Sequence, residues 1–143
     1  MIQTENINEA RKQIDKLSKE GKQVVVQGSS IEFNRLILEN KRVNMLILSH
    51  TNKKDKLKQK DSGLNHVLCN ITKENNIVLA FDMNELKVED KKLKASMLAR
   101  WQQNIDLIKK SKCKIKLING NSNSFYFLLT LGLPTDLAKE AVS

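Results

Sequence analysis

Short apolar runs alternate along the chain with stretches in which apolar residues recur every three or four positions. The runs predict buried strands, because a strand covered on both faces of a parallel sheet is apolar throughout. They lie at residues 23–28, 43–49, 77–81 and 114–118. The periodic stretches predict helices at residues 6–20, 29–39, 62–75, 90–111, 125–131 and 135–142.

Capping residues mark the starts of several of these helices. Asn6 with Glu9, and Ser29 with Glu32, fit the pattern in which a side-chain oxygen and an acid three residues later satisfy the first helical N–H groups. The third helix is expected to begin at a cap on Asp61 or Ser62. The apolar positions expected to face the core are Ile31, Leu36 and Ile37, then Leu64, Val67, Leu68 and Ile71, and then Met97, Trp101, Ile105 and Ile108.

The order of elements predicts an α/β fold with parallel strands and crossover helices. The 143 residues contain no obvious linker, so a single domain over residues 1–143 is expected. Four strands cannot close an eight-stranded barrel, so the sheet is either open or an incomplete TIM-barrel-like half. An uncovered edge of such a sheet would be protected by another subunit or, as a homodimer, by a second copy.

Charge gives the first indication of a partner. The formal net charge is +9, and the isoelectric point is near 9.6. Residues 53–60 carry five Lys and one Asp, and residues 109–116 carry five Lys and no acid. Such a surplus favours a polyanion such as RNA, since phosphate binding releases counterions. The alternative is a solvated, lysine-rich surface with no ligand.

Composition excludes several classes of protein. Hydrophobic residues make up 40% and charged residues 29%, which is typical of a folded, soluble chain. No apolar run is long enough to span a bilayer, and no apolar signal segment follows Met1, so a cytoplasmic location is expected. Cys69 and Cys113 are too few for a disulfide framework or a structural zinc site, and we expect two small buried side chains.

Polar residues follow each predicted strand, where parallel α/β proteins place their functional groups. Gln27, His50, Asp82 and Asn119 occupy these four positions. His50 with Asp82 could form a general-base pair or hold a metal ion, although no third ligand is in register. The alternative is that these residues are polar only because loops are polar. Glycine-rich phosphate loops and a G-x-S-x-G nucleophile turn are absent from the sequence.

Several sequence blocks resemble one known family. Residues 63–68 read G-L-N-H-V-L, and the apolar strand 76–81 reads N-I-V-L-A-F. A long helix follows, then a strand ending L-I-N-G at 117–120, and the chain closes with L-G-L-P and A-K-x-x-V-S. In this order and spacing, residues 22–143 resemble the ribonuclease P protein component 3 family of archaea.

The resemblance implies a TIM-barrel-like fold related to the PHP phosphoesterases, in an N-terminally shortened form. It implies a non-catalytic protein subunit of ribonuclease P, the enzyme that removes the 5′ leader of precursor tRNA. Catalysis would come from the RNA component and its Mg²⁺, with no cofactor on this chain, and a small ferredoxin-like subunit would be the protein partner. The residues that the resemblance offers for RNA or partner contact are Lys53, Lys54, Lys58, His66, Arg100 and Lys110.

Two other functions stay open at this stage. A small metal-dependent phosphoesterase would use His50 and Asp82, and its activity would be lost when either residue is replaced. A protein-binding scaffold would use its open sheet edge and would not bind RNA at physiological salt. For His66, the simpler alternative to a phosphate or partner contact is a half-exposed helical histidine.

Overall fold

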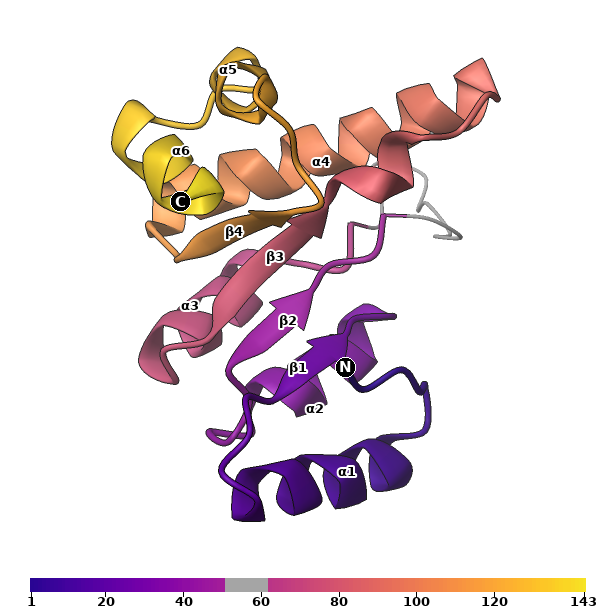
Figure 1. The fold of residues 1–143 in the computed structure, drawn as a ribbon, viewed down its shortest axis with the longest axis vertical. Coiled ribbons are helices and arrows are strands. Elements are labelled where there is room, and N and C mark those ends of the chain that lie inside the picture. The colour runs from indigo at the N-terminus through magenta and orange to yellow at the C-terminus, as the bar shows by residue number, and fades with distance from the viewer. Residues whose placement is uncertain (51–61) are drawn as a thin grey trace.

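A computed structural model describes residues 1–50 and 62–143 of the chain. It contains four strands, six α-helices and one short 3₁₀-helix within these residues (Figure 1). In chain order the elements are α1 (Ile7–Lys19), β1 (Val25–Gln27), α2 (Ile31–Leu38), β2 (Met45–Ile47), α3 (His66–Glu74), β3 (Val78–Asp82), η1 (Met83–Leu86), α4 (Lys91–Ser111), β4 (Ile115–Ile118), α5 (Ser124–Thr130) and α6 (Thr135–Val142).

The four strands form one parallel sheet in the order β1-β2-β3-β4. Leu46 pairs with Val26 on one side and with Leu79 on the other, so the register keeps like-facing apolar residues together. At the β1 edge, a single parallel bridge joins Ile2 to Val26. The sheet is therefore open, and the expected α/β fold with parallel strands and crossover helices is confirmed.

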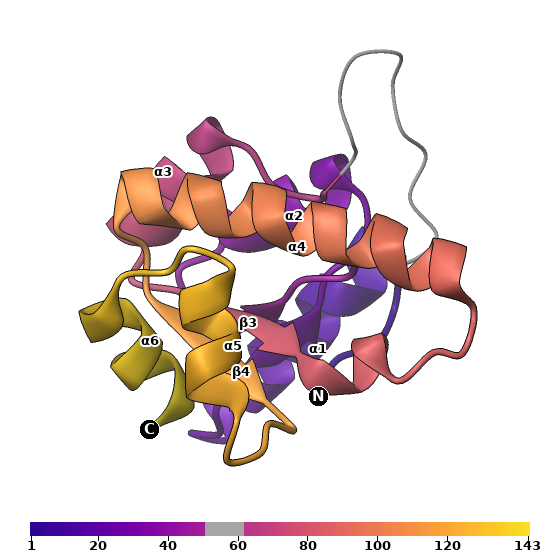
Figure 2. The same cartoon turned by 90° about the horizontal axis from the view of Figure 1, so that it is seen from above.

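The helices lie unevenly about this sheet. The helices α2, α3 and α4 lie behind it in Figure 1, and the view from above in Figure 2 places them on one side. The main core fills the space between, with Trp101, Phe81 and Leu46 fully buried. On the other face, Met45, Ile47 and Ala80 form a separate small cluster. The α6 helix packs beside β4 and contacts α5.

Local chemistry sets the helix boundaries. The Asn6 side chain accepts hydrogen bonds from the N–H groups of Asn8 and Glu9, as the capping pattern predicts. The long helix begins after its cap Asp90 and ends at Lys112, which has φ 57°. Gly28 is required where β1 turns towards α2, because a Cβ there would lie 2.8 Å from the carbonyl oxygen of Ile47.

Two predicted caps and two predicted core positions are wrong. The α2 helix is capped by Ser30, and α3 begins at the cap Asn65 rather than at residue 61 or 62. Leu36 is 38% exposed and Val67 is 43% exposed, so neither faces the core as predicted. The other predicted stripe, on α4, is confirmed by the full burial of Met97, Trp101, Ile105 and Ile108.

Candidate functional site

The four polar residues at the strand ends do not share one site. Asp82 caps η1 by accepting from Asn84 N–H at 2.9 Å, and it accepts from Asn119 Nδ2 at the same distance. Gln27 Nε2 lies 3.5 Å from the backbone oxygens of both Gly28 and Ile47. His50 is turned inward and is fully buried. The predicted His50–Asp82 pair is thus not formed.

His50 instead pairs with Glu85, a residue that the sequence analysis did not single out. The Nδ1 atom of His50 lies 3.0 Å from Glu85 Oε2, and its Nε2 atom lies 2.9 Å from Asn104 Nδ2. An ionised carboxylate only accepts and an amide nitrogen only donates, so these partners assign the proton to Nδ1 and make Nε2 an acceptor. These two contacts hold the imidazole ring in one orientation.

Aromatic and amide groups enclose this imidazole. Its ring centroid lies 5.1 Å from that of Phe81 and 5.4 Å from that of Trp101. Asn104 Nδ2 also donates to the backbone oxygen of Ser62, at 3.0 Å. With no exposed surface, His50 has no route to a substrate, and the contacts instead tie the end of β2 to α4 and η1.

Arg100 joins the same buried centre. Its side chain is only 5% exposed, and Nη1 donates to the backbone oxygen of His50 at 3.3 Å. Arg100 is one of the residues predicted for RNA or partner contact, whereas the structure places it in the interior beside Trp101. The guanidinium supports the chain segment that leaves β2.

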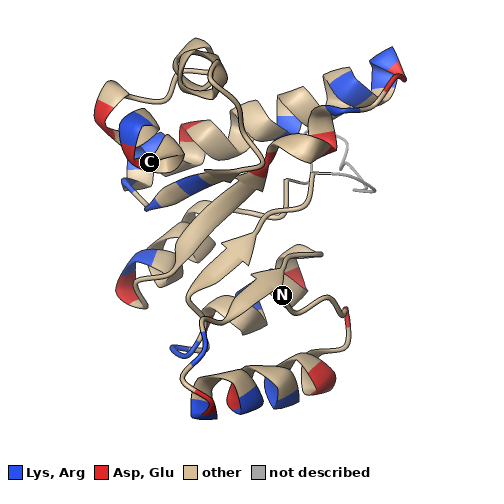
Figure 3. Ribbon diagram, viewed as in Figure 1, with Lys and Arg blue, Asp and Glu red and all other residues tan. Residues whose placement is uncertain are grey.

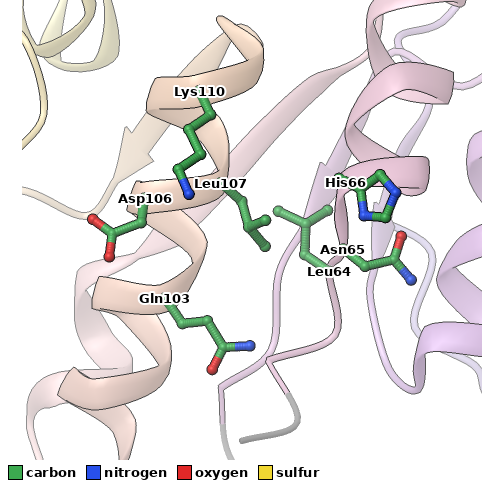
Figure 4. A pocket seen from close by; sticks show the side chains of 7 residues that line it. All are labelled: Leu64, Asn65, His66, Gln103, Asp106, Leu107 and Lys110. Carbon is green, nitrogen blue, oxygen red and sulfur yellow. The ribbon is translucent and has the colours of Figure 1, made fainter. Parts of the chain in front are cut away.

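His66 and Lys110 line opposite sides of a hollow between α3 and α4 (Figure 4). This hollow has a volume of about 260 Å³. Leu64 and Leu107 face each other at its centre, and His66 forms the wall on the α3 side. Both His66 and Lys110 are exposed. Two of the predicted contact residues, 44 positions apart in sequence, thus share one surface site.

The polar groups of this hollow suit binding better than catalysis. Gln103 and Asp106 line it from α4, and Asn65 lines it from the start of α3. Asn65 Oδ1 accepts from Leu68 N–H at 2.9 Å, so it is used as a helix cap. An ammonium group and an imidazole offer donors to a phosphate oxygen, and the single carboxylate of Asp106 lies on the same helix as Lys110.

The two lysine-rich stretches differ, because the structure describes residues 109–116 but not residues 53–60. Lys109, Lys112, Lys114 and Lys116 are all exposed, and the start of β4 is marked by blue beside α6 in Figure 3. Lys114 Nζ donates to Asn76 Oδ1 at 2.8 Å. The three other residues predicted for RNA or partner contact, Lys53, Lys54 and Lys58, lie outside the described residues.

The two cysteines are buried and close to each other, as small core residues are expected to be. Cys113 Sγ donates to the backbone oxygen of Cys69 at 3.3 Å, and both thiols are free. The hydrogen bond with Cys69, together with burial, raises the pKa of the Cys113 thiol. Cys113 therefore stays protonated at neutral pH and acts as an apolar side chain.

Metal and membrane chemistry receive no support from the part of the chain that the structure describes. Within residues 1–50 and 62–143, no three His, Cys, Asp or Glu side chains gather into a possible metal site. Over the same residues, no helix has both the length and the apolar character that crossing a membrane requires.

The fold and the surface define an open, parallel α/β chain with a hollow between two of its helices, α3 and α4. A chain of the same fold occurs in a solved structure titled "cryo-EM structure of archaeal Ribonuclease P with mature tRNA", with a TM-score of 0.76 and 23% identity. The match covers 98% of this chain and 62% of that chain. It confirms the TIM-barrel-like fold class.

Sequence relatives point the same way, and all those found carry the name ribonuclease P protein component 3. The protein of Methanothermobacter thermautotrophicus is 25% identical over 139 residues, which cover 97% of this chain and 54% of the relative. That of Methanosarcina barkeri is 30% identical and covers 97% and 59%. The resemblance to this family is thus confirmed as sequence similarity over most of this chain. No family model matches the chain.

The match covers only part of each relative. The chain spans about half the length of the curated relatives it matches. What the whole relatives do, and what they assemble with, is therefore only a proposal for this chain.

Proposed function

We propose that the chain is a non-catalytic protein subunit of ribonuclease P, which supports the catalytic RNA in removing the 5′ leader from precursor tRNA. The observation that carries the proposal is the shared name of its sequence relatives, ribonuclease P protein component 3. The net charge of +9 and the two exposed side chains of His66 and Lys110 that line one hollow give it a physical basis. In this proposal Mg²⁺ belongs to the RNA, and the chain resides in the cytoplasm.

The hollow between α3 and α4 is the proposed contact with RNA or a partner. Lys110 and His66 supply charge and hydrogen-bond donors, and Lys53, Lys54 and Lys58 precede α3 in sequence. Arg100 enters the proposal as a positioning residue, because its guanidinium holds the His50 carbonyl and not the surface. The partners proposed are the ribonuclease P RNA, precursor tRNA and a small ferredoxin-like subunit.

A homodimer through an open sheet edge is a further part of the proposal. At the β1 edge, Ile2 N–H donates to Val25 O at 2.8 Å and Ile2 O accepts from Gln27 N–H at 2.9 Å, so the N-terminal segment already pairs with this strand and the proposed dimer would use the other edge strand, β4. Sedimentation equilibrium over a range of protein concentrations tests it. A single monomeric species at all concentrations would remove the dimer from the proposal.

The phosphoesterase alternative loses the residues on which it rested. It required His50 and Asp82 to act together, but His50 is fully buried and bonded to Glu85. The scaffold alternative is tested by the same experiment. It predicts that the chain associates with a protein subunit and that reversing the charge of a residue such as Lys110 leaves precursor-tRNA cleavage unchanged.

Reconstitution of precursor-tRNA cleavage tests the proposed function. The cognate RNA and the other protein subunits are assayed at moderate Mg²⁺ with and without the chain. We expect the chain to raise the rate or to lower the Mg²⁺ requirement. Lys110→Glu should weaken this effect by about tenfold, since it reverses a charge that would face phosphate.

Lys109→Glu is the matched control for that variant. Lys109 is also exposed, lies next to Lys110 on the same helix and does not line the hollow. Equal losses in the two variants would show that only the overall charge matters. No change in cleavage on adding the unmodified chain would contradict the proposed function.

A further inference from the structure

A second cavity opens at the carboxyl edge of the sheet, apart from the hollow that contains His66 and Lys110. Its volume is about 410 Å³, and η1, α4 and the connection from β4 to α5 form its walls. Ligand cavities of proteins occupy roughly 300–1,000 Å³, and this edge is where parallel α/β sheets bind their ligands. The position and the size are therefore those of a site for one small group.

The inner wall of this cavity is apolar and includes an aromatic ring. Met83 and Leu98 line it from η1 and α4, and Phe127 lines it from α5. The Phe127 ring is held edge-on against the buried Trp101, with centroids 6.0 Å apart. A fixed aromatic ring beside aliphatic side chains offers a surface on which a flat, partly apolar ring can pack.

The rim is cationic. Lys87 and Lys94 both line the cavity and are exposed, and no acidic residue is part of its described lining. The nearby Asp82 carboxylate accepts hydrogen bonds from Asn84 N–H and Asn119 Nδ2. Two ammonium groups over an apolar floor call for a ligand that has an anionic group attached to a flat ring.

Amide groups occupy the remaining side. Asn119 and Asn121 line the cavity from the loop between β4 and α5. The Asn121 N–H donates to Ser124 Oγ at 2.7 Å, and a Cβ at Gly120 would lie 2.6 Å from the same oxygen. Only glycine lets the loop approach α5 this closely, and that approach sets the two amides at the rim.

We infer that this cavity binds one nucleotide of single-stranded RNA, with its base unstacked and its phosphate at Lys87 and Lys94. The base would lie against Phe127 and Leu98, with its polar edge towards the asparagine amides. A base within a duplex is stacked on its neighbours and cannot enter, so the site selects single strands. The inference rests on the proposed function in that it takes RNA as the partner.

A protein ligand fits these groups less well. An apolar side chain of a peptide would fill the floor of the cavity and its backbone could meet the amides, but it carries no anionic group of its own for the two ammonium ions. A nucleotide matches all three kinds of lining at once. Peptide binding is therefore treated as an outcome that would overturn the inference.

Binding of a labelled, short single-stranded oligoribonucleotide to the purified full chain tests the site. One 2-aminopurine base in the strand reports unstacking by its fluorescence, and a duplex of the same sequence serves as competitor. Lys87→Glu with Lys94→Glu should lower the affinity about tenfold, and Leu98→Trp, which fills the cavity, should remove the fluorescence change. Lys91→Glu with Lys92→Glu is the charge-matched control, because these exposed lysines lie next to the cavity but do not line it.

The result expected is a loss at least several times larger in the cavity pair than in the control pair, with an unchanged circular dichroism spectrum. Equal losses in both pairs, or equal competition by the duplex, would overturn the inference. So would cavity variants that keep their RNA affinity but no longer bind a protein subunit. If the oligoribonucleotide binds as expected while the chain has no effect on precursor-tRNA cleavage, the proposed function fails and the nucleotide site remains.

Discussion

Buried polar side chains hold the end of β2 against α4. His50, Glu85 and Asn104 form a chain of hydrogen bonds in which each donor faces an acceptor. In a low-dielectric interior such contacts stabilise only while every member has its partner, since an unpaired buried polar group is costly. The residue that looked catalytic from its position after a strand is, in its folded surroundings, a structural link.

Glu85→Ala tests this account at the level of one residue. The change removes the acceptor of His50 Nδ1 and the partner of Trp101 Nε1, which lies 3.5 Å from Glu85 Oε2. We expect the free energy of unfolding to fall by about 1–3 kcal/mol, as measured by urea denaturation. Glu89→Ala, at an exposed position three residues beyond η1, is the control and should leave it unchanged. Similar stabilities for the two variants would mean that the buried pair contributes little.

Among the elements, α3 is the one whose start determines the binding hollow. Asn65 caps the helix through its side chain, and His66 is the first helical residue. Asn65→Ala should lower the free energy of unfolding by about 1 kcal/mol and should weaken RNA binding, because the fraying first turn no longer fixes His66. Unfolding and RNA titration of the same variant measure the two effects. Asn70→Ala, at an exposed position of the same helix, should change neither.

The order of elements could be predicted from sequence because each apolar run and each periodic stretch still marks one element when its ends are misplaced by a few residues. The cap of α2 could not, unlike that of α1, since Ser29 and Ser30 offer two starts for α2. Ser29 N–H donates to Asn34 Oδ1 and its hydroxyl to Glu5, which leaves Ser30 to cap the helix. Tertiary contacts decide such choices, and no local pattern contains them.

The candidate site, like the fold, could be predicted from the sequence only in part. Family motifs selected His66 and Lys110 separately, but only the packing of α3 on α4 brings them to one hollow. Glu85 was missed because it lies on a four-residue 3₁₀-helix, η1, which leaves no periodic signal. Arg100 was offered by the same resemblance as a basic residue of the long helix, although it occurs on the α4 side that Met97 and Trp101 mark as buried. Charge alone does not distinguish a surface cation from a buried one.

At the scale of the whole molecule, the question is which of the many surface lysines bind RNA. The net charge of +9 would attract RNA wherever the lysines stood, so affinity by itself cannot identify a binding surface. A comparison of two variants that have the same change in net charge, but at different places on the surface, can identify it. Lys53, Lys54 and Lys58 precede the hollow in sequence, whereas Lys12, Lys16 and Lys19 lie exposed on α1.

Replacing either set of three lysines by Glu gives that comparison. We expect the change at residues 53, 54 and 58 to lower the affinity for ribonuclease P RNA more strongly and to reduce the slope of log affinity against log salt by roughly 0.7–0.9 for each phosphate that is no longer neutralised. The change on α1 should alter affinity only through long-range attraction, which disappears as salt shortens the Debye length. Titrations at several salt concentrations separate the two effects. If both variants lose affinity and slope equally, the lysines before α3 act only as part of a solvated basic surface.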